Sequence, residues 1–144
     1  MSMSDMQSAL TQLWVDVNDN FIPDGPIATM YPNVRFDPPD NAPWCYFYVV
    51  FGRTFVGSLG TQGTDEVNGL ANMELYYPSN KGVAGIMAAF DAIREGGFKA
   101  GNYLTYSGQQ VLIQRSAEVL SQPVVDEAYL TMTVRAEWYA QIQR

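Results

Sequence analysis

Histidine, the side chain that most often moves protons at neutral pH, is absent from this chain. Its absence removes the usual general bases, Ser-His-Asp triads and most zinc sites. Adjacent carboxylate pairs, Asp65/Glu66 and Asp126/Glu127, fall in predicted loops, where solvated charge is the ordinary role. A retaining glycosidase needs two carboxylates opposed across a cleft, and the sequence does not place any pair in this way. The residue types therefore predict a protein that is not an enzyme and that uses no cofactor.

Two segments resemble ligand-binding loops only superficially. Residues 16–20 carry side-chain oxygens at alternate positions, as a calcium loop does, but Phe21 stands where a glycine must turn the chain and Ile27 where a bidentate glutamate is needed. The glycine-rich stretch 52–69 has neither a P-loop lysine nor a dinucleotide fingerprint opening a helix. We expect no metal at the first segment, and a flexible hairpin tip at the second.

The single cysteine, Cys45, lies inside an apolar run and is expected to be a small buried hydrophobe. One cysteine excludes an internal disulfide and fits a reducing compartment. The first five residues lack the basic and apolar regions of a signal peptide, and no segment approaches the roughly 20 apolar residues of a membrane span. We expect a soluble protein made inside a cell, with no membrane partner.

Composition predicts one domain, residues 1–144, because 47% apolar residues can build a proper core at this length. Charged residues are scarce (16%) and aromatics abundant (13%), which fits either a well-filled core or a surface hidden against a partner. The net charge is −7, and the basic residues are scattered without clustering. The electrostatics therefore argue against a protein that binds a specific nucleic-acid sequence. They are compatible with a surface along which DNA passes without binding.

The first third of the chain predicts a helix and then two strands. Apolar residues at three- and four-residue spacing define a helix over residues 4–20, with Ser4 and Gln7 as a capping box. A short strand is expected at 27–31. Residues 44–51 are strong β-formers and should make a central strand.

The middle third predicts a long antiparallel hairpin and a second helix. Residues 70–77 alternate in polarity, so the glycine-rich stretch should join two paired strands. Gly96 and Gly97 should end the second helix. The expected buried stripe of this helix consists of Val83, Ile86, Met87, Phe90 and Ile93.

The last third is predicted to be β. A strand is expected at 110–119, and another at 129–140, where polarity alternates almost perfectly. Its apolar face comprises Leu130, Met132, Val134, Ala136 and Trp138. The fold class is therefore α+β, with an antiparallel or mixed sheet of about five strands, two helices packed on one face, and the order α-β-β-β-α-β-β.

A proline-rich segment before the aromatic strand carries a family resemblance. Together with the amphipathic first helix, the glycine-rich loop, and a strand ending Tyr76-Tyr77-Pro78-Ser79 before Gly82, it resembles the tail-terminator, or tail-completion, proteins of long-tailed bacteriophages. The chain departs from the family in its long loop at 57–69, which has no basic residue. The segment consists of Tyr31, Pro32, Asn33, Val34, Arg35, Phe36, Asp37, Pro38 and Pro39.

The resemblance implies a structural virion protein at the head-proximal end of the tail, assembled in the host cytoplasm. Such proteins form a ring, usually of six subunits, that caps the tail tube, stops its polymerisation and joins it to the head. The implied partners are further copies of the chain, the tail tube protein, and a head-completion or neck protein. A head–tail connector or other neck ring is the alternative, and a small-molecule-binding domain with an enclosed apolar pocket is a third reading.

Two sets of residues are candidate partner contacts. The first is the glycine-rich loop, which we expect to be mobile in the free protein and ordered on a partner; it comprises Gly57, Gly60, Thr61, Gln62, Gly63, Thr64, Asp65 and Glu66. The second is the polar side of the last strand, with Thr131, Thr133 and Arg135.

Overall fold

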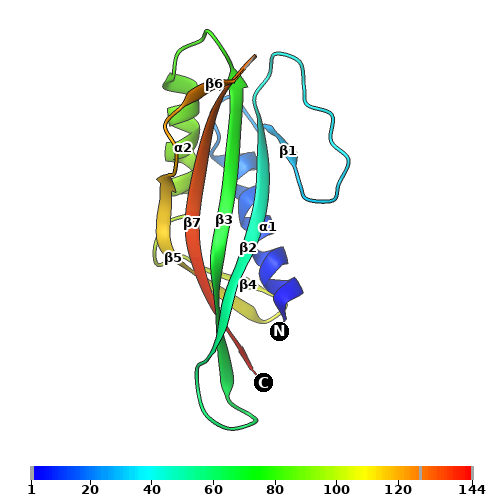
Figure 1. The fold of residues 1–144 in the computed structure, drawn as a ribbon, viewed down its shortest axis with the longest axis vertical. Coiled ribbons are helices and arrows are strands. Elements are labelled where there is room, and N and C mark those ends of the chain that lie inside the picture. Colours follow the sequence, from blue (N-terminus) through cyan, green and yellow to red (C-terminus); the bar gives the residue numbers. More distant parts are fainter. Residues whose placement is uncertain (1, 127, 144) are drawn as a thin grey trace.

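The computed structural model describes residues 2–126 and 128–143, which form an α+β fold around one mixed sheet (Figure 1). The elements are α1 (Met3–Asn20), β1 (Ala28–Met30), β2 (Trp44–Val56), β3 (Thr64–Pro78), α2 (Ala84–Gly96), β4 (Tyr103–Tyr106), β5 (Gln109–Val119), β6 (Val124–Asp126) and β7 (Tyr129–Gln143). The strand order is β1-β2-β3-β7-β5-β4, with β6 also paired to β7. Only β1 and β2 are parallel; every other pair is antiparallel.

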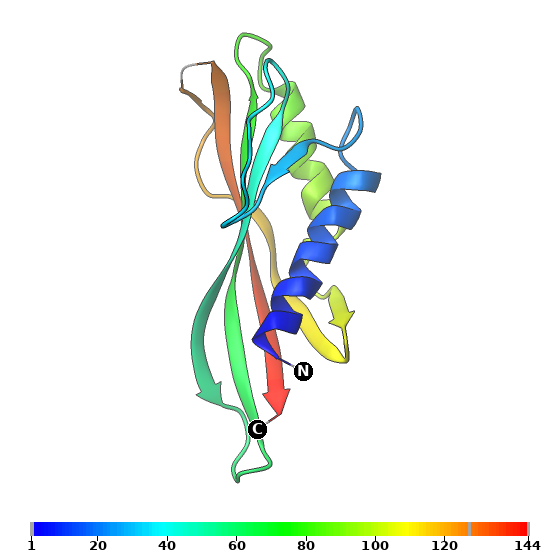
Figure 2. The ribbon, with the colours of Figure 1, turned by 90° about the vertical axis from the view of Figure 1, so that its right-hand side faces the viewer.

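Both helices lie on the same side of the sheet, as predicted (Figure 2). The α1 stripe packs into the core, with Met6, Leu10, Trp14 and Val17 fully buried. On β7 the predicted alternation is confirmed, because Leu130, Met132, Val134, Ala136 and Trp138 are all buried. No helix of the described residues lies over the opposite face of the sheet (Figure 2).

The start of α1 differs from expectation, whereas its end at Asn20 is confirmed. The helix begins at Met3, so Ser4 lies inside it and Ser2 is the N-cap; the Ser2 hydroxyl accepts a hydrogen bond from the Asp5 N–H (3.1 Å). The predicted Ser4 capping box is therefore wrong. Asn18 fixes the end of the helix, because its buried amide donates to the Ile27 carbonyl (2.8 Å) and accepts from the Ile27 N–H (2.9 Å).

The buried face of α2 is shifted from the predicted stripe. Ile86, Ala89 and Ile93 are buried, whereas Val83 and Met87 are 53% and 37% exposed. The prediction weighted large apolar residues and overlooked the small Ala89, which allows the helix to approach the sheet closely.

The sheet has more strands than the expected five or so. The additional strands are β4, which turns into β5 through Ser107 and Gly108 with positive φ (50° and 82°), and the three-residue β6. Neither is long enough to show a period-2 pattern in the sequence.

The expectation that β2 is a central strand is also corrected. β1 borders it only from Trp44 to Tyr46, so the rest of β2 lies at an edge.

Candidate assembly surfaces

The β2–β3 hairpin extends past the N-terminal end of α1 as an arm, which we define as residues 54–66 (Figures 1 and 2). A bulge between Phe51 and Thr54 separates the arm from the upper part of β2. Apolar side chains are exposed along it: Phe55 by 49%, Val56 by 66% and Leu59, at the tip, by 91%. An exposed leucine at a loop tip contributes no burial within the monomer, so the arm presents apolar surface to solvent.

The predicted loop residues divide between the tip and a strand. The tip connecting β2 to β3 is residues 57–63, and it contains Gly57, Gly60, Thr61, Gln62 and Gly63. Thr64, Asp65 and Glu66 instead belong to β3 and pair with β7 at Gln143, Ile142 and Gln141. The predicted loop to residue 69 was therefore too long, while a role for these residues in partner binding stays a prediction.

Glycine in the middle of a strand explains that error. Gly69 lies opposite Trp138 in the β3–β7 register, and a Cβ on Gly69 would lie 2.6 Å from Trp138 Cζ2. This glycine therefore makes room for the indole ring. The sequence shows only the absent side chain and suggests a loop.

The uncovered face of the sheet carries the second candidate set. This set consists of three partly exposed β7 residues, Thr131, Thr133 and Arg135. Their partners on β3 are, in the same order, Tyr76, Glu74 and Asn72. The Arg135 Nε–H donates to Asn72 Oδ1 at 3.2 Å. The Asn72 side-chain amide thus holds the Arg135 guanidinium in place, and this face carries fixed polar groups. These two groups do not form a catalytic pair.

The proline-rich segment covers the upper end of the same face. Phe36 packs on Trp44 (ring centroids 5.3 Å apart), Trp44 stacks on Tyr76 (3.9 Å), and the Tyr129 hydroxyl donates to the Pro39 carbonyl at 2.6 Å. At its start, Tyr31 meets Phe47 edge-on. Asn33 adopts a left-handed conformation (φ 58°) that turns the segment. The segment thus completes an aromatic cluster of this chain.

Burial keeps the potential nucleophiles protonated. Burial, and then the Glu74 carboxylate, raise the pKa of the Cys45 thiol well above its ordinary value. Burial is also the main reason why the pKa values of Tyr76 and Tyr77 rise to about 12. A catalytic thiolate or phenolate needs the opposite shift, so none of these groups is activated.

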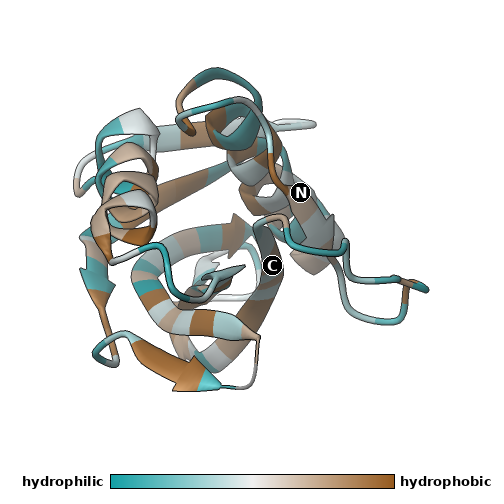
Figure 3. Ribbon diagram, turned by 90° about the horizontal axis from the view of Figure 1, so that it is seen from above, coloured by the Kyte–Doolittle hydropathy of each residue, from teal (hydrophilic) through white to brown (hydrophobic). Residues whose placement is uncertain are grey.

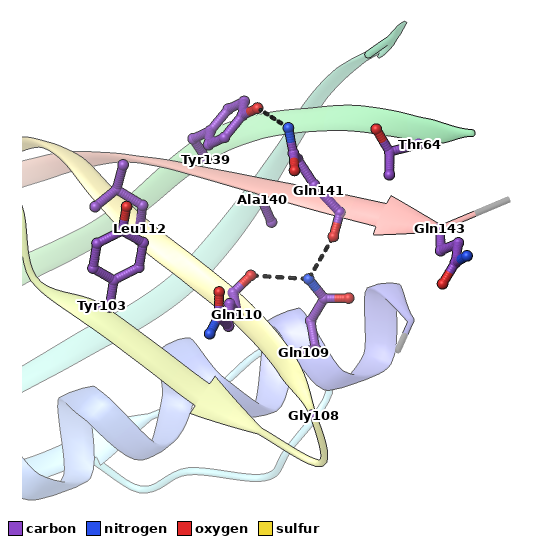
Figure 4. A pocket seen from close by; sticks show the side chains of 10 residues that line it. All are labelled: Thr64, Tyr103, Gly108, Gln109, Gln110, Leu112, Tyr139, Ala140, Gln141 and Gln143. Carbon is purple, nitrogen blue, oxygen red and sulfur yellow. Dashed lines mark hydrogen bonds between the residues drawn. The ribbon is translucent and has the colours of Figure 1, made fainter. Parts of the chain in front are cut away.

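Two surface hollows lie at different places on the molecule. One, of about 450 Å³, is lined by amide and hydroxyl side chains; Gln109 Nε2 donates to the Gln110 and Gln141 carbonyls at 2.9 Å each (Figure 4). The other, of about 460 Å³, lies at the end opposite the arm and is lined largely by prolines with Tyr77, Ile86 and Lys81. The lining of the first hollow has no carboxylate or amine side chain, whereas the second has Asp24 and Lys81. Both hollows are open to solvent.

A flank of exposed apolar residues was not found from the sequence. Leu120 is exposed by 48%, Val124 by 57% and Val125 by 63%, and β6 stands as a hydrophobic segment at the periphery of the sheet (Figure 3). The signal available in the sequence was the pair of valines, Val124 and Val125, directly after Pro123.

Residues 2–126 and 128–143 contain no group of three or more Cys, Asp or Glu side chains placed to hold a metal ion. The Asp16–Asn20 stretch forms the last turn of α1 rather than a loop. Of the carboxylate pair Asp126/Glu127, Glu127 lies outside the described residues. Among the helices described, none is long and apolar enough to span a membrane.

The fold thus defines a small α+β protein with three prominent exposed features: an apolar arm, an uncovered sheet face and an apolar flank. The family model of phage tail terminator proteins matches residues 8–138, so the chain belongs to the phage tail terminator family. Membership implies a structural role in the virion tail.

Similarity to other proteins adds support for the fold alone. A solved structure whose name describes no function aligns with a TM-score of 0.79 at 16% sequence identity, covering 99% of this chain and 97% of that one. Among curated proteins, none matches the chain in sequence.

Proposed function

We propose that this protein caps the tail tube as a ring, most simply of six subunits, stops tube polymerisation and provides the surface to which the head is joined. Family membership supports the role, and the arm is the observation that carries the mechanism. A tube of stacked identical rings presents the same end after every addition. Stopping growth therefore requires a protein that matches that end on one side and differs on the other.

The two ends of this molecule differ in the required way. At one end the arm presents Phe55, Val56 and Leu59 to solvent. At the opposite end lies the proline-lined hollow with Lys81. We assign the arm to the tube, because its exposed apolar side chains can be buried by a partner, and the hollow end to a head-completion or neck protein.

Charge fits a ring through which DNA passes. The chain carries a net charge of −7, and its basic residues are not clustered. An acidic lumen would repel the phosphate backbone and let DNA slide without binding. The protein would act by binding other proteins and would not recognise a nucleic-acid sequence.

The decisive experiment is a phage that lacks this protein. We expect filled heads and separate, often overlong tails that do not join, measured as tail lengths by electron microscopy. A neck ring would instead leave tails of normal length that fail to attach. A normal length distribution would therefore contradict termination and favour the neck role.

The uncovered face can be tested in the same complementation assay. Thr133→Glu places a charge on a partly exposed strand residue and should give a folded protein that fails to complement. Gln12→Glu, on the exposed side of α1, is the matched control and should complement normally. Full complementation by Thr133→Glu would remove this face from the assembly contacts.

A further inference from the structure

Two strand edges of the sheet have no partner among the described residues. β1 borders β2 only at Trp44–Tyr46, which leaves the outer edge of β2 open from Phe47 onward. On the other side of the sheet, β6 pairs with β7 and no described strand covers its outer edge. Open edges present rows of unpaired backbone donors and acceptors, which proteins ordinarily protect or pair.

Both edges are mainly apolar where they would pair, and Asp126 is the one charged side chain among the residues 48–50 and 124–126. On β2, Val50 and Phe51 are each 38% exposed, and the edge is regular down to the bulge that follows Phe51. On β6, Val124 and Val125 are more than half exposed. Pairing of the β6 edge of one subunit with the β2 edge of the next is a head-to-tail contact, which generates a ring or a filament.

The strand directions allow this pairing. β7 is antiparallel to β3, and β3 is antiparallel to β2, so β7 and β2 run the same way. β6 is antiparallel to β7. A neighbour's β6 laid along β2 therefore continues the antiparallel sheet.

The offset between the two edges, measured along the strands, is compatible with closure of a ring when Val125 is opposite a neighbour's Val49. Val125 is level with Leu130 and Tyr77, while Val49 is level with Ala71, so the two positions differ by six residues along β3 (77 − 71). At ~3.4 Å per residue the offset is ~20 Å, and the four strands β6-β7-β3-β2 span ~19 Å at ~4.8 Å each. The strands of a closed ring would then tilt by about 45°, near the range of about 35–45° found in closed barrels.

We propose that, in the ring, β6 of each subunit pairs antiparallel with the β2 edge of its neighbour, with Val124, Val125 and Asp126 opposite Val50, Val49 and Tyr48. Because the offset of six residues is an even number, opposed residues of the two strands have their side chains on the same face of the sheet. Val125 and Val49 both lie on the helix-covered face, since they are level with the buried Leu130 and Ala71. Val124 and Val50 then meet on the other face. This inference rests on the ring of the proposed function.

A disulfide between subunits tests the register. In Val49→Cys/Val125→Cys, directly opposed residues would fall within the Cα separation of a disulfide. The native Cys45 can stay, because it is fully buried and its thiol pKa is raised well above the ordinary value. Oxidation of concentrated protein, or of protein bound to tail tubes, should give a ladder of covalent oligomers ending in one closed species. Gln12→Cys/Val125→Cys is the matched control and should give no ladder.

The outcomes separate this contact from the capping role. Rings visible by electron microscopy without a ladder from the Val49/Val125 pair, or with an equal ladder from the control, would overturn the edge pairing and leave the cap intact. Failure of the unmodified chain to form rings in concentrated solution and on tubes would overturn both.

Should the double-cysteine variant fail to fold, Val125→Lys replaces it. The side chain is 63% exposed, so the monomer should melt as the unmodified chain does while rings are lost. Rings formed normally by Val125→Lys would overturn the edge pairing.

Discussion

Both halves of β2 contain aromatic and valine residues, but these residues lie in opposite surroundings. In the first half, Cys45 and Phe47 are fully buried beneath α1, and Phe47 stacks on Trp14 with ring centroids 5.9 Å apart. In the second half, Phe55 and Val56 are 49% and 66% exposed, and no described element covers them. The same β-forming residue types thus hold the monomer together at one end and remain available for assembly at the other.

This difference teaches where apolar surface contributes to folding. Burial of a side chain stabilises the monomer only when the monomer itself removes that side chain from water. Apolar residues of the arm and of the β6 flank contribute instead when a partner covers them. Mutations in the two regions should therefore separate stability from assembly.

The largest expected effect is in the buried half. Trp14 is fully buried, and its Nε1–H donates to Thr29 Oγ1 at 3.0 Å. Trp14→Ala should lower the free energy of unfolding by about 3–5 kcal/mol, measured by urea denaturation. Phe55→Ala, in the exposed half of β2, is the comparison and should stay within about 0.5 kcal/mol of the unmodified chain. Equal losses would contradict the division of β2.

A smaller effect is expected at alkaline pH. In the folded chain the pKa of Tyr77 is raised from 10.0 to about 12, mainly by burial. The folded state therefore binds the phenol proton more tightly than the unfolded state; the resulting stability is complete below pH 10 and is lost as the pH rises toward 12. Tyr77→Phe should lose less stability over that interval, measured as melting temperature against pH. The control is Tyr106→Phe, at an exposed tyrosine, which should follow the unmodified chain.

The smallest effect on stability is expected at the tip of the arm. Leu59 is 91% exposed, so Leu59→Ser should change the free energy of unfolding by less than about 0.5 kcal/mol. Attachment to tail tubes, measured by co-sedimentation, should nevertheless fall. Gln62→Ser, in the same tip, is the matched control for attachment. A clear loss of stability with normal attachment would show that the tip belongs to the core.

Sequence by itself determined the elements whose patterns repeat over many residues. The α1 stripe spans about three helical turns, and the β7 alternation runs from Leu130 to Trp138, so each pattern has enough repeats to identify both the element and its buried face. The fold class, the absence of histidine chemistry and the resemblance to tail terminators follow from such local or ordered features.

Only the tertiary structure decided which apolar residues remain uncovered. Val83, Leu59 and Val125 have the same apolar character as the core residues, and their exposure depends on which elements pack nearby. The strand status of Gly69 likewise depends on Trp138, which lies opposite it but distant in the chain. Local sequence records a side chain's preference for burial, whereas the neighbour that buries it, or leaves it open for a second molecule, is set by the long-range pairing of the strands.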